Sequence, residues 1–301
     1  MLQEVFSWLG MRTLPMDVLR QRYAQSPSRF VRVEGLDVHV RDEGQGPALV
    51  LLHGVMASLH TWDDWVADLK KDHRVVRIDT PGHGLTGPFP DGVYNPERYI
   101  RVIAGVLDAL GVDKASMIGN SMGGYLSALF AATHPQRVER LVVIDPAAYP
   151  MPYPPLLGLA ALPVMNSLVI PNALPRPIVS LGIHQVYGDA SRIRPGVVDR
   201  YFDMTQREGN RRAFTAIVRT LGALRHTQPE FIKTIRAHTL VMWGEKDRWI
   251  PVAHVPLWQR DLRSSETVIY PDAGHIPMEE IPARSVADVR RFLKAEARAV
   301  A

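Results

Sequence analysis

The sequence predicts an α/β protein built on one mostly parallel sheet that is interrupted by a large insertion. Two patterns indicate this fold class. Short apolar runs alternate with segments of helical periodicity, and the alternation stops at Pro146 and resumes at His238. A chain of 301 residues is long enough for one large domain with an inserted lobe. We therefore expect an N-terminal helical extension over 1–28, a core over 29–145 and 238–301, and a cap over 146–237.

The individual elements follow from local patterns. Residues 29–44 alternate apolar and polar side chains around Gly35, which predicts a β-hairpin. The uninterrupted apolar run at 47–54 predicts a strand buried on both faces, and the helical period of 99–111 ends at a glycine. The same reasoning predicts further strands at 75–78, 114–121, 139–146, 238–244 and 266–271, and further helices at 122–134, 256–262 and 281–297.

Composition narrows the chemistry that this chain can perform. The apolar content of 46% and the charged content of 22% are ordinary for a globular protein, and the formal net charge of +4 is too mild to predict a nucleic-acid partner. The absence of cysteine excludes disulfides, cysteine-ligated zinc and thiol nucleophiles. Neither a phosphate-binding loop nor an H-E-x-x-H zinc motif occurs. We therefore expect no cofactor and no metal.

The N-terminal extension predicts two short helices. Gly10 would end the first, whose apolar residues recur at helical spacing: Leu2, Val5, Phe6 and Leu9. The second would begin near Pro15, with Thr13 or Leu14 at its cap. We favour a surface helix that packs on its own domain over one that binds a membrane surface or forms a homodimer. Glu4 interrupts the apolar stretch, so no secretory signal is expected, and the predicted location is cytoplasmic, with contact at the membrane periphery as the other reading.

The sequence GNSMGG places Ser121 between a predicted strand and a predicted helix. A G-x-S-x-G pattern in this position is typical of a sharp turn that presents a nucleophilic serine above a sheet. Gly119 and Gly123 would let the strand and the helix approach each other, because neither has a side chain. The hydroxyl would lie at the helix N-terminus, where developing negative charge is favoured.

A serine nucleophile needs a base and an acid that orients the base. His275 is the best candidate base among eleven histidines, because it follows the last predicted strand in a turn-rich loop. Asp247, after the preceding strand, is our choice for the acid from the chain order Ser–Asp–His, and Asp145 is the alternative. Asp272 is expected to be a turn residue. Four other histidines are expected to be surface or structural residues: His184, His226, His238 and His254.

The segment LLHG predicts an oxyanion hole. His53 and Gly54 end a strand, so the next amide, that of Val55, would point to the same place as the amide of Met122. Two amides directed at a tetrahedral oxyanion can each lower a barrier by about 3 to 4 kcal/mol. We expect His53 to order this loop and not to act as a base.

Five motifs in this order, LLHG, DTPGHG, GNSMGG, WGEKDRWIP and PDAGHIPMEE, resemble those of the α/β-hydrolase fold superfamily. The resemblance extends from Arg29 to the C-terminus and is strongest to bacterial esterases and lipases, and to C–C bond hydrolases that cleave meta-cleavage products. It implies a doubly wound, mostly parallel sheet of eight strands with a helical cap inserted after the sixth. It also implies a triad and two oxyanion donors: Ser121, Asp247 and His275, with Val55 and Met122. Haloalkane dehalogenases and epoxide hydrolases are disfavoured, since they carry aspartate at the elbow.

The first part of the insertion is apolar and rich in proline. No charged residue lies between Pro146 and Pro175, and eight prolines fall in this range. Each interior proline costs a helix about 3 kcal/mol, so a membrane-spanning helix is not expected. The segment would roof the serine and favour an acyl chain or a hydrophobic ring, or its leucines would pack the cap's own core.

The second part of the insertion is basic. Eight arginines lie between Arg192 and Arg225, against three acidic residues. Ion pairs at helical spacing, Asp203 with Arg207 or Glu208 with Arg212, would make this a solvated helix face. The other reading is that the apolar and basic parts of the cap rest on an anionic membrane surface.

These features lead to a primary hypothesis and two alternatives. The first is hydrolysis of a carboxylic ester or lipid with an apolar acyl chain through an acyl-enzyme. The alternative is C–C bond hydrolysis of a meta-cleavage product, whose carboxylate would need a cation that the early cap lacks before Arg176. A non-catalytic binding protein is the third, and it is disfavoured because every triad member has a candidate.

Overall fold

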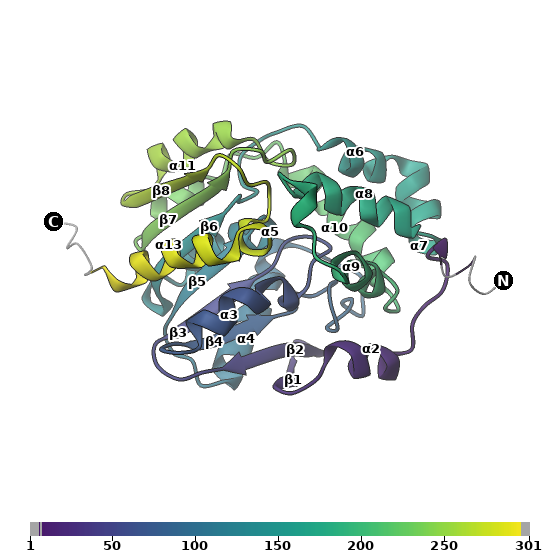
Figure 1. The fold of residues 1–301 in the computed structure, drawn as a ribbon, viewed down its shortest axis with the longest axis horizontal. Helices are drawn as coiled ribbons and strands as arrows, with labels where there is room; N and C mark the ends of the chain where they lie inside the picture. Colours follow the sequence, from purple (N-terminus) through teal and green to yellow (C-terminus); the bar gives the residue numbers. More distant parts are fainter. Residues whose placement is uncertain (1–5, 7, 296–301) are drawn as a thin grey trace.

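The core of the protein is a single sheet of eight strands in the order β1-β2-β4-β3-β5-β6-β7-β8 (Figure 1). The computed structural model describes residue 6 and residues 8–295. Strand β2 is antiparallel to both of its neighbours, and every other neighbouring pair is parallel. The strands are β1 Ser28–Val33, β2 Leu36–Glu43, β3 Ala48–Leu52, β4 Arg74–Ile78, β5 Ala115–Asn120, β6 Val138–Ile144, β7 His238–Gly244 and β8 Ser265–Tyr270. The predicted eight-stranded, mostly parallel sheet is confirmed.

Helices cover both faces of the sheet, because alternate side chains of each buried strand enter different cores. In β3, Val50 and Leu52 pack in one cluster with residues of α4 and α5, whereas Leu49 and Leu51 pack in the other with residues of α3 and α13. Figure 1 shows α3 and α13 together in front of the sheet. The core helices are α3 Asp63–Leu69, α4 Pro96–Ala109, α5 Met122–Thr133, α11 Val255–Asp261, α12 Pro277–Glu280 and α13 Pro282–Lys294.

The insertion follows β6, the sixth strand, and consists of helices gathered on one side of the sheet (Figure 1). We keep the name cap for residues 146–237. Its helices are α6 Pro155–Ala161, α7 Ile170–Asn172, α8 Arg176–Val186, α9 Val197–Thr205 and α10 Asn210–Leu224, and residues 165–169 form a π-helical turn between α6 and α7. Leu157 and Ile170 are buried against Phe214 and Val218 of α10, so the apolar part of the cap does pack a small core of its own.

The arginines of the cap bind other partners than the sequence predicts. In the described part of the chain neither predicted pair at helical spacing forms, since Asp203 binds Arg22 and Arg207 donates to the backbone carbonyl of Thr86. Three arginines instead reach carboxylates of the core: Arg192 with Asp272, Arg194 with Asp64 and Arg200 with Glu279. These pairs join residues more than 60 positions apart, and they tie the cap to the sheet domain.

The described part of the N-terminal extension packs on the rest of the chain. Helix α2 spans Met16–Tyr23 and has Pro15 at its cap position, so the predicted cap at Thr13 or Leu14 is wrong. Leu19 is fully buried against Leu85 and Met204. The predicted helix over 2–9 lies mostly outside the described residues. No single helix in 8–295 is long and apolar enough to cross a membrane. Segments Pro155–Ala161 and Met165–Asn172 meet that criterion only as a pair, bent by 76°.

Candidate active site

Ser121 lies at the turn between β5 and α5, with φ of 56° and ψ of −119°. Positive φ is costly for a residue with a side chain, so the turn is strained. A Cβ atom at Gly119 would lie 2.1 Å from the carbonyl oxygen of Gly123, and one at Gly123 would lie 2.1 Å from that of Leu52. Backbone atoms cannot accommodate such contacts, so this elbow requires glycine at both predicted positions.

His275 and Asp247 are joined by a buried hydrogen bond of 2.7 Å between Nδ1 and Oδ2. The other carboxylate oxygen of Asp247 accepts from the amides of Trp249 and Ile250, at 2.7 and 3.0 Å. The loop of His275 is itself held, because Glu280 accepts from the amide of Gly274 at 2.7 Å. Asp247 therefore has a fixed orientation and makes the contact that a triad acid requires.

Asp145, the alternative acid, makes no hydrogen bond to His275 in the described structure. It is fully buried at the end of β6, and its Oδ1 accepts from the amide of Gly244 at 2.9 Å. Burial and the adjacent Asp247 carboxylate raise the pKa of Asp145 well above its usual value. We therefore interpret Asp145 as a neutral acid, and its buried Oδ2 has no hydrogen-bond partner in the described structure.

Polar atoms of Asp145, Asp247 and His275 all lie within 4.8 Å of one another, which is close enough to surround a small metal ion. Most of the candidate ligand atoms of these residues, however, already take part in hydrogen bonds. One carboxylate oxygen of Asp247 accepts a hydrogen bond from His275, and the other accepts from two backbone amides. A tetrahedral metal site needs about four free ligand atoms. The donor set is therefore better suited to holding a proton than a metal ion.

His53 orders the loop that carries the predicted oxyanion donor. Its Nε2 accepts from the amide of Thr80 at 3.1 Å, so its Nδ1 carries the proton and donates to the carbonyl oxygen of Gly54 at 2.8 Å. Burial lowers the pKa of His53, which keeps the ring neutral. Because the carbonyl and amide of one planar peptide point in opposite directions, holding the Gly54 oxygen also fixes the direction of the Val55 N–H.

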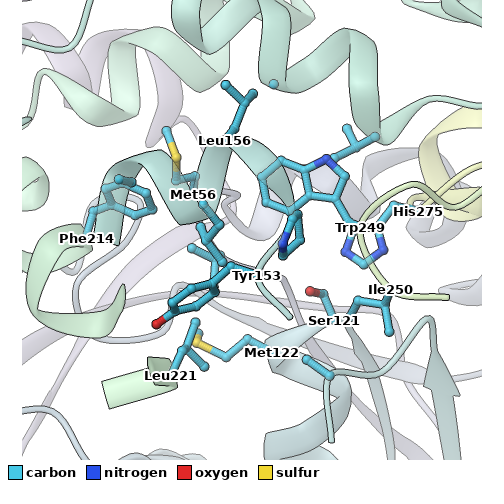
Figure 2. Close-up of a pocket in the computed structure, with 18 of the residues that line it drawn as sticks. Met56, Ser121, Met122, Tyr153, Leu156, Phe214, Leu221, Trp249, Ile250 and His275 are labelled. Atoms are coloured by element: carbon cyan, nitrogen blue, oxygen red, sulfur yellow. The ribbon is translucent and has the colours of Figure 1, made fainter. Parts of the chain in front are cut away.

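Site residues from three loops face one cavity of about 310 Å³ (Figure 2). Val55, Ser121, Met122 and His275 all line it. In the described residues no hydrogen bond joins the hydroxyl of Ser121 to the imidazole of His275. Such catalytic hydrogen bonds are often long in free enzymes and shorten when substrate binds.

Two cavity residues were not identified from the sequence. The indole of Trp249 stacks beside the imidazole of His275, with ring centroids 6.2 Å apart. Arg225, just after α10, is the only arginine or lysine among the described residues that line the cavity, and its guanidinium lies 4.7 Å from the ring centroid of Tyr153. Trp249 falls inside the motif that supplied Asp247, whereas no local pattern distinguishes Arg225 from the other cap arginines.

The remaining sequence candidates lie outside the cavity. Asp272 binds Arg192 and Arg284. None of the four histidines expected to be surface or structural lines the described cavity: His184, His226, His238 and His254.

The comparisons with known proteins identify the family of the chain. The family model described as alpha/beta hydrolase fold matches residues 47–282. A 2-hydroxy-6-oxo-2,4-heptadienoate hydrolase from Pseudomonas putida is 30% identical over 279 residues, covering 89% of this chain and 96% of that protein. A crystal structure of a membrane phospholipase A from a bacterium is 27% identical with a TM-score of 0.75, covering 92% of this chain and 88% of the other.

The solved structure of a meta-cleavage product hydrolase from Pseudomonas fluorescens is also similar, with a TM-score of 0.77 over 89% of this chain and 97% of that protein. Because the two sequences are only 22% identical, this similarity supports the fold alone. The family match covers well over half of the sequence, and its range contains the elbow, both acids and His275. The chain belongs to the alpha/beta hydrolase fold family.

Proposed function

We propose that the protein is a serine hydrolase in which Ser121 attacks the carbonyl carbon of an apolar substrate. His275 takes the serine proton at Nε2, while Asp247 holds Nδ1–H and so keeps Nε2 free to accept. The amides of Val55 and Met122 receive the negative charge that develops on the carbonyl oxygen. The observation that carries this proposal is the buried hydrogen bond of 2.7 Å between His275 and Asp247, beside the cavity that contains Ser121.

The first candidate reaction is hydrolysis of a carboxylic ester with an apolar acyl chain, or of a lipid, through an acyl-enzyme that water resolves. The cavity supports it, because its lining is almost entirely apolar and includes Leu156, Leu157 and Phe214. Each methylene buried there would contribute about 0.8 kcal/mol. Similarity to a membrane phospholipase A also favours a lipid ester.

The second candidate is hydrolysis of a C–C bond in a meta-cleavage product, and the named relatives support it better than ester cleavage. The Pseudomonas putida relative is named a 2-hydroxy-6-oxo-2,4-heptadienoate hydrolase, and one from a Pseudomonas species, 29% identical over 283 residues, is named a 2-hydroxymuconate semialdehyde hydrolase. Such substrates carry a carboxylate. Arg176 binds Asp199, but Arg225 lines the cavity and supplies a cation, so the sequence argument against this reaction loses its force.

The two reactions can be distinguished by measuring turnover of two substrate classes side by side: p-nitrophenyl esters from acetate to palmitate, and 2-hydroxy-6-oxo-hexadienoates. In either case Ser121→Ala should reduce kcat/KM to below about a hundredth. Arg225→Gln should raise KM at least about tenfold for the carboxylate substrate if that reaction is the physiological one, and leave ester turnover unchanged. Turnover of neither class, together with no labelling of Ser121 by a fluorophosphonate probe, would contradict the proposal and revive a non-catalytic role.

A further inference from the structure

Most of the large exposed apolar side chains in the described residues lie on the cap and the N-terminal segment. Eleven large hydrophobic side chains are exposed in the described residues, and nine of them belong to this region: Phe6, Trp8, Met11, Leu159, Leu162, Val164, Leu168, Ile178 and Leu181. Val164 and Leu168 are 65% and 64% exposed. Isolated exposed leucines are ordinary, but a concentration of this kind indicates an interaction surface.

These side chains belong to neighbouring elements. The Gly10 carbonyl accepts from the amide of Leu174, two residues after the end of α7, so the N-terminal segment adjoins the cap. The position of a Cβ at Gly182 of α8 would be 4.0 Å from Leu156 of α6, which places these two helices against each other. Figure 1 shows α6, α7 and α8 at the same end of the molecule. We call this set of nine exposed side chains the apolar face.

Unpaired arginines border the apolar face. Helix α10 packs on α6 and α7 and carries no carboxylate. In the described part of the chain, Arg12, Arg212, Arg219 and Arg225 form no ion pair with a carboxylate, whereas the arginines that tie the cap to the core do. Arg219 donates to Asn166, which lies between Val164 and Leu168 in the sequence. The carbonyl of Arg12 accepts from Arg211, which brings residue 12 beside α10.

The apolar face also adjoins the cavity. Leu159 and Ile178 line the cavity that holds Ser121, and they are 44% and 42% exposed. A substrate that passes these two side chains would leave water for an apolar surface before it reaches the serine. No charged residue lies in the 30 residues from Pro146 to Pro175 to oppose that transfer.

We propose that the apolar face docks on the surface of an anionic lipid bilayer, with its leucines inserted among the acyl chains and the bordering arginines on the lipid headgroups. The combination of an uncharged apolar surface with a cationic border is the composition that such interfacial binding requires. A second copy of this chain would have to bring four more arginines to the same border, which disfavours a symmetric dimer through this face. The inference does not depend on which bond Ser121 attacks.

The test is flotation of the full chain with vesicles of phosphatidylcholine, with and without a quarter of phosphatidylglycerol. We expect binding to the anionic vesicles, and at least about tenfold weaker partitioning for Val164→Asp with Leu168→Asp. These two side chains do not line the cavity, so labelling of Ser121 by a fluorophosphonate should be unchanged. Val93→Asp is the matched control, since Val93 is 52% exposed outside the apolar face. Arg212→Glu should weaken binding to the anionic vesicles alone.

Three results would overturn the proposal. The first is no binding of the unaltered chain to anionic vesicles. The second is equal loss of binding in Val93→Asp and in the double variant. The third is a dimer in size-exclusion chromatography that the double variant converts to monomer while neither form binds vesicles, since the face would then be a protein interface. Equal binding of the unaltered chain to neutral and anionic vesicles would remove the role assigned to the arginines.

Discussion

The identity of the triad acid can be tested by replacing each buried aspartate with asparagine. In Asp247→Asn the amide oxygen can keep the hydrogen bonds from Trp249 and Ile250, at 2.7 and 3.0 Å, so the NH2 group faces His275. The NH2 group is a hydrogen-bond donor and cannot accept the hydrogen bond that Nδ1–H donates to the carboxylate. The proton of the imidazole then moves to Nε2, and the base loses the lone pair that it needs for the proton of Ser121.

Asp145→Asn has the opposite consequence. The amide oxygen can accept from Gly244, as Oδ1 does at 2.9 Å, and the uncharged NH2 group takes the place of the buried Oδ2, which has no hydrogen-bond partner. The substitution therefore reproduces the neutral state that we assign to Asp145. We expect Asp247→Asn to lower kcat by about ten-thousandfold, equivalent to about 5.5 kcal/mol, and Asp145→Asn to change it by less than about threefold.

The assay is the rate at which a fluorophosphonate labels Ser121, which needs no knowledge of the physiological substrate, together with kcat on whichever substrate class is turned over. Circular dichroism of both variants controls for folding. Loss of labelling in Asp145→Asn with retention in Asp247→Asn would refute the assignment and make Asp145 the triad acid. Similar losses in both would refute the neutral state of Asp145.

Two further predictions concern stability. Because burial raises the pKa of Asp145 in the folded state, the folded protein holds a proton that the unfolded chain releases above about pH 4. The free energy of unfolding, relative to that of Asp145→Asn, should therefore fall by up to about 1.4 kcal/mol per pH unit from about pH 4 until the folded pKa is reached. Urea unfolding of both proteins at about pH 5, 6 and 7 measures this difference, and parallel pH dependences would count against the prediction. Glu279 is buried and accepts from Arg200 at 2.7 Å, so Glu279→Gln should lower the free energy of unfolding by about 3 to 5 kcal/mol, because a buried guanidinium loses its charged partner. Glu230→Gln, which removes an exposed pair with Lys233, should lower it by less than about 1 kcal/mol. Equal losses in the two variants would show that the buried pair does not stabilise the fold more than an exposed one.

The sequence predicts the positions of the strands and of the loops that carry the candidate catalytic residues, because the signals for both are local. Apolar runs and turn residues locate every strand to within a few positions, and Ser121, Asp247 and His275 each follow a strand end. In a parallel sheet these ends lie at one edge, so strand position alone predicts that the three loops are neighbours. The glycines at 119 and 123 are predictable for the same reason, since the turn itself demands them.

The cap is less predictable because its contacts are distant in sequence. Helical spacing predicts an ion pair between Asp203 and Arg207, but in the structure the Asp203 carboxylate binds Arg22 of the N-terminal extension. A buried carboxylate, Glu279, is the partner of Arg200, 79 positions away. Whether an arginine binds the core, borders a surface or enters a cavity depends on the path of the chain between helices, and for this reason Arg225 could not be separated from its neighbours.

Glu280 has a consequence for inactivation. Besides the amide of Gly274, its carboxylate accepts from the amides of Gly188 and Asp189 in the cap, at 2.9 and 2.8 Å. The amide of His275 also donates to the carbonyl of Val186 at the end of α8. The loop that carries His275 and the cap are thus joined at the same point. On gradual heating, loosening of this junction would misalign the imidazole while the sheet is intact, so enzyme activity should disappear before the far-ultraviolet signal of secondary structure does.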